Sequence, residues 1–234
     1  MKAAFLSEFA SVRSTLAQMA LIYLACGIFI CVGMKSAFGM VGAISAMTPF
    51  FLTFTFAGYD AMNGWERYRA TLPLSRRDIV LGRYANVLAC SVVAAAASVV
   101  IGLAVTALVP ALPIGEEFSA RLAEESDPAL LTFVAVAALG IMLVVTSFLL
   151  PVVLRFGLNK AIRFVPLGMF VVIMLGGLAL PNIAGMSEVF AQLDAWLSNP
   201  ANIPLATAAI AGITLIVFAA SCLIAMRLYR EKDL

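Results

Sequence analysis

Histidine is absent from this 234-residue chain, and its absence removes several kinds of chemistry at once. A chain without histidine cannot form a Ser-His-Asp triad, a histidine-ligated zinc site or a histidine proton relay. Charged residues are also scarce, at 12% of the chain, whereas 63% of the residues are hydrophobic. Because so few polar side chains cannot cover a soluble globule, the composition predicts a membrane protein.

Nucleotide-binding and metal-binding motifs are missing as well. The pattern GxxxxGK[ST], whose backbone N–H groups hold nucleotide phosphates, does not occur in the sequence. If the protein depends on ATP, a partner must therefore bind the ATP and its Mg²⁺, and no cofactor site is predicted in this chain. The four cysteines lie inside apolar stretches without metal-ligand spacing, so we expect them to be structural. They are Cys26, Cys31, Cys90 and Cys222.

Six apolar stretches dominate the chain. A helix needs roughly 18 or more apolar residues to cross a hydrocarbon core of about 30 Å, and only the fifth stretch is marginal. The expected spans are 16–34, 38–59, 85–109, 129–150, 164–180 and 204–226. The prediction is an all-α polytopic membrane protein, with residues 1–234 forming one transmembrane domain of six helices.

The basic residues are distributed unequally between the two sides of this predicted bundle. If both termini are cytoplasmic, all of the 15 Lys and Arg residues except Lys35 and Arg121 lie on the cytoplasmic side. The positive-inside rule therefore places both ends of the chain in the cytoplasm. Because the same rule explains where the basic residues lie, they give no reason to expect nucleic acid as a partner.

The interiors of the predicted spans contain no Asp, Glu, Lys or Arg at depth. Carriers driven by ions normally place an ionisable group near the middle of the membrane. The absence of such ionisable groups argues against a proton-driven or sodium-driven cycle. Any energy would therefore have to enter from outside the membrane.

The residues before the first span carry a helical apolar stripe, and Glu8 lies off it. The stripe consists of Phe5, Phe9, Val12 and Leu16. Such a pattern predicts an N-terminal helix that lies in the inner membrane interface. A second interpretation is that this helix simply leads into the first span, and the two interpretations are compatible.

The expected cytoplasmic loop between the second and third spans has a distinct pattern. Trp65, Tyr68 and Leu72 recur at helical spacing, which predicts a short amphipathic helix, and Pro73 should end it. Ser75 is the expected N-cap of the next helix, with Asp78 as its capping-box-like partner.

The third helix is predicted to be longer than the membrane is thick. It should run from Ser75 to Val109, a length of about 52 Å at 1.5 Å per residue, so its first turns should project into the cytoplasm. Within it, Ala94, Ser98 and Gly102 recur every four residues. This small-xxx-small pattern predicts a helix-packing face, used either within the bundle or in a dimer.

Two short helices are expected in the outer loops. Residues 116–126 should form an acidic helix with Phe118 and Leu122 on one side, and Ser187 should cap a second helix. The apolar face of that second helix would consist of Phe190, Leu193, Trp196 and Leu197. Two interpretations are open for each helix: an ordinary connection between spans, or a cover of an exit path.

The stretch from Asp60 to Tyr84 resembles the signature loop of the permeases of type-2 ATP-binding-cassette (ABC) transporters, in the small six-span bacterial branch. The positions that carry the resemblance are Asp60, Trp65, Leu72-Pro73-Leu74-Ser75-Arg76 and Arg83-Tyr84. The ending Tyr229-Arg230-Glu231 is similar to the usual tail of the family.

This resemblance implies an exporter permease in the bacterial plasma membrane, not itself an enzyme. It would pair with a second permease, either a copy or a relative, and with two copies of a cytoplasmic ATPase. The substrate would be amphipathic or hydrophobic: a peptide, a lipid or a drug. The short helix would be the coupling helix that contacts the ATPase. The residues expected at that contact are Trp65, Glu66, Arg67, Tyr68, Leu72, Pro73, Ser75, Arg76 and Arg77.

Two other functions stay open at this stage. A six-span channel or carrier that does not use ATP would need a polar pore, and the spans are too apolar to line one obviously. An accessory membrane protein or membrane-embedded enzyme would need converging polar side chains, and only Asp60, Asn63 and Glu66 cluster.

Overall fold

Helices form all of the regular structure in the part of the chain that the computed structural model describes, residues 2–62, 75–109, 116–157 and 186–230. The helices are α1 (Lys2–Met34), α2 (Ala37–Met62), α4 (Arg76–Leu108), α5 (Glu116–Glu124), α6 (Pro128–Phe156), α8 (Met186–Leu197), the 3₁₀ helix η3 (Pro200–Asn202) and α9 (Ile203–Arg230). The predicted all-α class is therefore confirmed. The expected fifth span, 164–180, and the expected coupling helix lie outside the described residues.

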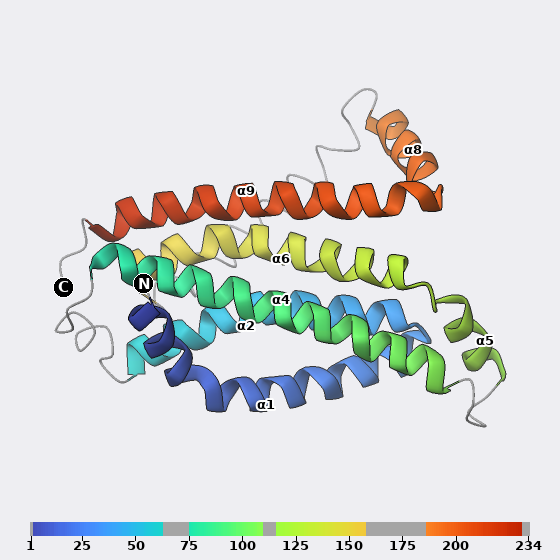
Figure 1. Cartoon of the computed structure of the whole chain (residues 1–234), viewed down its shortest axis with the longest axis horizontal. Helices are drawn as coiled ribbons and strands as arrows, with labels where there is room; N and C mark the ends of the chain where they lie inside the picture. Colours follow the sequence, from blue (N-terminus) through green and yellow to red (C-terminus); the bar gives the residue numbers. More distant parts are fainter. Residues whose placement is uncertain (1, 63–74, 110–115, 158–185, 231–234) are drawn as a thin grey trace.

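Five of these helices are long and apolar enough to cross a membrane: α1, α2, α4, α6 and α9. They cover the expected spans other than the fifth, and they run roughly parallel in one bundle (Figure 1). The N-terminus, the start of α4 and the end of α9 lie at one end of the bundle, here called the basal end (Figure 1). The short helices α5 and α8 lie at the opposite end, so the two ends differ in structure.

Helices α2 and α6 form the interior of the bundle. In their most apolar windows 50% and 44% of the residues are buried, against 17% in α1. Large apolar side chains such as Phe29, Phe148 and Ile216 are exposed on the outer faces, which suits contact with lipid. The buried core has one cluster toward the basal end, around Phe56, Tyr84 and Phe218, and a second cluster that includes Leu122 of α5.

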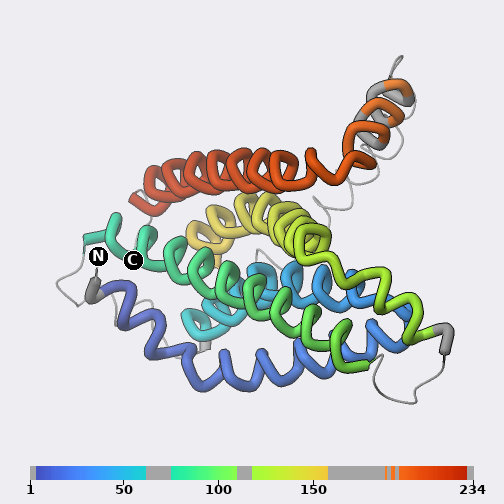
Figure 2. Tube along the Cα trace, turned by 45° about the vertical axis from the view of Figure 1, so that its right-hand side comes forward, coloured from blue at the N-terminus to red at the C-terminus, as the bar shows by residue number. Residues whose placement is uncertain are grey.

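The N-terminal segment is continuous with the first span, as the lead-in interpretation requires, and the two parts meet at a bend (Figure 2). The expected stripe coincides with its buried face only in part. Ala4, Glu8 and Val12 are buried in the first turns, whereas Phe9 is 39% exposed. Glu8, which lies off the apolar stripe, is nevertheless buried, because its carboxylate binds a buried arginine of α4.

The start of α4 follows the sequence prediction. The Ser75 hydroxyl accepts a hydrogen bond from the Asp78 backbone N–H at 3.1 Å and donates one to the Asp78 carboxylate at 2.8 Å. This cap satisfies one of the unpaired N–H groups of the first turn. The helix then runs for 33 residues, or about 50 Å, which confirms the predicted length.

A carboxylate holds the end of the bundle that lies opposite the basal end. Glu125, which follows α5, accepts hydrogen bonds from the Ser36 hydroxyl at 3.0 Å and from the backbone N–H groups of Ala37 and Phe38 at 2.6 and 3.2 Å. Glu125 thereby caps the first turn of α2 and ties the α5–α6 connection to the α1–α2 turn.

The expected acidic helix is confirmed as α5. Helix α8 begins at Met186, so Ser187 lies in its first turn and is not the N-cap.

Candidate functional site

A buried ion network joins three helices at the basal end. Arg83, near the start of α4, is 1% exposed. Its Nε and Nη2 donate hydrogen bonds to the Glu8 carboxylate at 3.0 and 3.1 Å, and Nη2 also donates to Asp60 Oδ2 at 2.9 Å. Since Glu8 belongs to α1 and Asp60 to the last turn of α2, one guanidinium connects all three helices. Charge-assisted bonds with two contacts to one carboxylate are among the strongest that proteins form. Glu8, Asp60 and Arg83 are called the Arg83 network below.

The first turns of α1 lie directly on α4 beside this network. A Cβ atom on Gly82 would lie 3.2 Å from the carbonyl carbon of Ala4, closer than most side chains approach a backbone. The Asn86 amide donates a hydrogen bond to the Phe5 carbonyl at 3.1 Å. The lack of a side chain at Gly82 therefore permits the approach that brings Glu8 to Arg83.

Tyr84 makes the contacts on the other side of α4. Its hydroxyl lies 2.8 Å from Ser221 Oγ, and its ring lies 4.9 Å from that of Phe218, both on α9. The Ser221 hydroxyl donates to the Ser147 carbonyl of α6. Because a serine hydroxyl has one proton to donate, Tyr84 must be the donor to Ser221. Two consecutive residues, Arg83 and Tyr84, thus bind α4 to α1, α2 and α9, and Ser221 extends this connection to α6.

The last turn of α9 is also tied to its neighbours. Arg76 Nη1 donates to the Arg230 carbonyl at 2.9 Å, and Arg155 Nη1 of α6 lies 3.5 Å from the Leu228 carbonyl. These bonds satisfy carbonyl groups that the end of a helix leaves unpaired. The basal ends of α4, α6 and α9 are therefore joined.

The structure describes three of the residues expected at the ATPase contact. Ser75 caps α4, Arg76 binds the end of α9, and Arg77 is exposed at the basal end. The other expected contact residues lie outside the described ranges. They are Trp65, Glu66, Arg67, Tyr68, Leu72 and Pro73.

The small residues of α4 pack against α2 of the same chain. Ser98 Oγ lies 3.0 Å from Ser45 Oγ, and both side chains are buried. A Cβ on Gly102 would lie 2.6 Å from Cγ2 of Val41, a distance that no ordinary contact reaches. Ala94, one helical turn before Ser98, lines an apolar groove between α1, α2 and α4. Within the described structure, Ser98 and Gly102 thus serve packing inside the bundle, and a dimer contact through them is not required.

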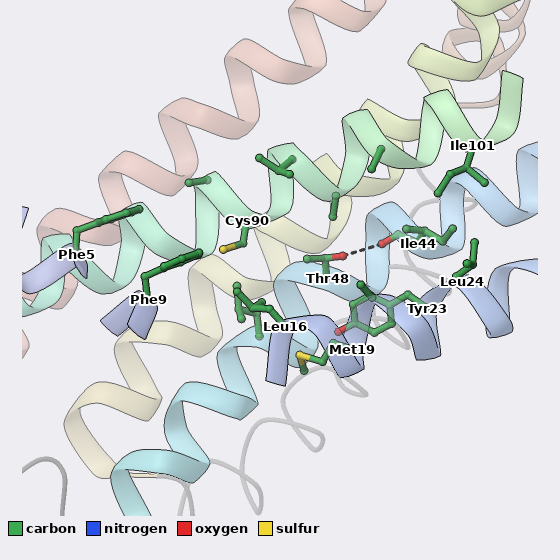
Figure 3. Close-up of a pocket in the computed structure, with 16 residues that line it drawn as sticks. Phe5, Phe9, Leu16, Met19, Tyr23, Leu24, Ile44, Thr48, Cys90 and Ile101 are labelled. Carbon is green, nitrogen blue, oxygen red and sulfur yellow. Dashed lines mark hydrogen bonds between the residues drawn. The ribbon is translucent and has the colours of Figure 1, made fainter. Parts of the chain in front are cut away.

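An apolar groove lies between α1, α2 and α4, with a volume of about 450 Å³ (Figure 3). Phe5 and Phe9 of the predicted stripe line one end of it, with Leu16 and Met19 farther along. The Thr48 hydroxyl donates to the Ile44 carbonyl, and the buried Tyr23 hydroxyl has no hydrogen-bond partner within the described part of the chain. This lining suits hydrocarbon rather than an ion.

Among the described residues, no group of three or more Cys, Asp or Glu side chains is placed to hold a metal ion. All four cysteines are free thiols, two buried and two partly buried.

Comparisons with curated proteins and with solved structures find no significant match. A family model described as "ABC-2 family transporter protein" matches residues 5–230, which include the Arg83 network, Tyr84 and all five described spans. The match confirms the resemblance seen in the loop, and it implies partnership with an ABC ATPase. The chain therefore belongs to the ABC-2 family of transporter proteins, as a multi-pass membrane permease.

Proposed function

We propose that this chain is the permease subunit of an ABC exporter in the bacterial plasma membrane, with both termini in the cytoplasm. Two copies of a separate ATPase would supply the energy, and a second permease would complete the transporter. The observation that supports this proposal most is that Arg83 and Tyr84, placed just after the loop that resembles the coupling segment, bind α4 directly to three other spans and, through Ser221, to a fourth.

We infer that an ATPase would act on the connection between α2 and α4, because the helix ends that flank this connection are joined. The connection leaves α2 just after Asp60 and enters α4 shortly before Arg83, and these two side chains are joined at 2.9 Å. A push on the loop would consequently act on both helices together, and through Glu8 on α1. The neutral bonds from Tyr84 to Ser221 would pass the movement on to α9 and α6.

The apolar groove supports a hydrophobic or amphipathic substrate. Ligand sites are commonly concave and mostly apolar, and side chains such as Phe5, Phe9 and Leu16 give this groove such a lining. The channel alternative would need a polar path. Apolar side chains dominate both this groove and the cavity between α4, α6 and α9.

The proposed orientation makes a direct prediction. In a variant that lacks the four native cysteines, Glu117→Cys and Asp194→Cys should react in intact cells with a thiol reagent that cannot cross the membrane. Arg77→Cys should react only after the cells are opened, because the basal end faces the cytoplasm. Labelling of Arg77→Cys in intact cells would reverse the orientation.

The need for an ATPase in trans tests the proposed function itself. The purified chain should bind no ATP, since it has no phosphate-binding loop. When it is co-expressed with its cognate ABC ATPase, the two should purify as a complex. Glu117→Ala, at the opposite end of the molecule, should purify with the ATPase as the wild type does. Tight ATP binding by the isolated chain would refute the permease assignment.

A further inference from the structure

A basic cavity of about 650 Å³ lies at the basal end, between the start of α4 and the end of α9. The described residues that line it are Arg77, Leu223, Met226, Arg227 and Arg230. Within the described ranges, the ion pairs join Arg83 to Glu8 and Asp60, and none involves an arginine of this cavity. Three guanidinium groups thus face one space without a carboxylate from the described residues.

The two helices hold these arginines at a defined separation. The bond from Arg76 Nη1 to the Arg230 carbonyl ties the first turn of α4 to the last turn of α9. Arg77 follows Arg76 directly, and Arg227 lies one turn before Arg230 on the same face of α9. Hence the described residues of the cavity belong to two packed helices, α4 and α9.

The apolar residues of the cavity lie deeper in the membrane span than the arginines. Leu223 precedes Arg227 by four residues and Met226 precedes Arg230 by four, so each apolar side chain lies one helical turn farther from the basal end. Leu223 is 60% exposed, and its neighbour Ile224 is exposed as well. In a membrane span, exposed apolar side chains of this kind face lipid. The cavity is consequently open toward the bilayer.

We propose that this cavity binds the headgroup of an anionic phospholipid, with the phosphate among Arg77, Arg227 and Arg230 and an acyl chain along Leu223 and Met226. Guanidinium groups bind phosphate oxygens through paired hydrogen bonds. Basic pockets between membrane helices at the cytoplasmic side are suited to anionic headgroups. An acidic surface of the ATPase could pair with the arginines, but it would not use the apolar wall beneath them. The inner leaflet as the source of the lipid rests on the proposed orientation.

Native mass spectrometry of the purified chain, equilibrated with equal amounts of phosphatidylglycerol and phosphatidylcholine, tests this site. Each basic residue near an anionic headgroup contributes about fivefold in affinity, so with three arginines we expect wild-type protein to retain phosphatidylglycerol about 100-fold over phosphatidylcholine. The combined variant Arg77→Gln, Arg227→Gln, Arg230→Gln should bind the two lipids about equally. Arg13→Gln, which removes an exposed arginine that does not line the cavity, should keep the wild-type preference.

The outcomes separate the proposal from its alternatives. The three arginines are exposed, so glutamine should leave the packing intact, and Arg77→Lys, Arg227→Lys, Arg230→Lys should keep most of the lipid preference. If the combined glutamine variant does not purify as a folded protein, Arg227→Gln alone should lower the preference about fivefold. Equal lipid preference in wild type and in the glutamine variants would overturn the proposal.

A second arm distinguishes a lipid headgroup from free phosphate. Inorganic phosphate at millimolar concentration should not displace phosphatidylglycerol, because it lacks the acyl chain that contacts Leu223 and Met226. Displacement at that concentration would show a site for small anions and contradict a lipid site. Neither arm involves the ATPase, so the outcome is independent of whether the permease assignment holds.

Discussion

Replacing Arg83 with methionine is expected to destabilise the protein by about 3–5 kcal/mol, because the change leaves two carboxylates without their buried partner. Glu8 is 1% exposed and receives two hydrogen bonds from Arg83, and Asp60 receives a third. The guanidinium also lies 4.7 Å from the ring centre of Phe56. Thermal unfolding in detergent measures this loss. A thiol-reactive dye would report unfolding as the four cysteines become accessible.

Two further variants make this result specific. Arg13→Met removes an exposed arginine from α1 and should change stability by less than about 0.5 kcal/mol. The combined variant Glu8→Gln, Asp60→Asn, Arg83→Met removes all three charges and should recover most of the loss, since a buried ion network can often be replaced by neutral groups at little cost. If Arg83→Met alone unfolds at the wild-type temperature, the network contributes no stability and cannot hold the three helices together.

The neutral combined variant also separates stability from coupling. It should fold and assemble with the ATPase, but the charge-assisted link between the two ends of the α2–α4 loop would be gone. We therefore expect ATP hydrolysis in its complex to respond less to substrate than in the wild-type complex.

Local chemistry predicted much of the fold. Apolar length predicted the spans that became α1, α2, α4, α6 and α9, because a bilayer of fixed thickness demands helices of a fixed minimum length. The Ser75 cap and the long α4 were likewise readable, since they depend on residues close together in the sequence. The described residues do not extend to the fifth span or the coupling helix, which remain predictions.

The Arg83 network was not predicted, although Asp60 and Arg83 were both singled out. The bond between Glu8 and Arg83 joins residues 75 positions apart, and no local pattern encodes such a distance. The burial of Glu8 on α1 was not predicted for a related reason. In a membrane protein an apolar side chain can face lipid or a groove, as Phe9 does, while a charged side chain must find a partner inside. The buried face therefore contains Glu8.

The spacing of small residues in α4 predicted close packing but not its partner. Ser98 and Gly102 meet Ser45 and Val41 of α2. A small-xxx-small pattern states only that a backbone can approach closely, and the tertiary arrangement decides which helix does so.

The second large effect is expected at Leu72. If its side chain inserts into an apolar groove of the ATPase with Trp65 and Tyr68, Leu72→Asp would place a charge against that groove at a cost of several kcal/mol. The complex should then fail to form at ordinary concentrations. Co-purification of the ATPase with Leu72→Asp, compared with Glu117→Ala at matched expression, measures this loss of assembly.

Pro73→Ala should have a different effect from Leu72→Asp. Removing the proline would allow the predicted coupling helix to continue toward α4 and would erase the predicted corner between them. The apolar contact would be kept, so the complex should still form, but movement of the ATPase would no longer reach the start of α4 in the right direction. Substrate would then fail to stimulate ATP hydrolysis by an assembled complex.

Substrate-stimulated ATP hydrolysis by the reconstituted complex tests most directly whether this loop couples the ATPase to the permease. Wild type and Glu117→Ala should show full stimulation, Pro73→Ala should assemble without stimulation, and Leu72→Asp should show neither assembly nor stimulation. Equal stimulation in Leu72→Asp and wild type would contradict the account.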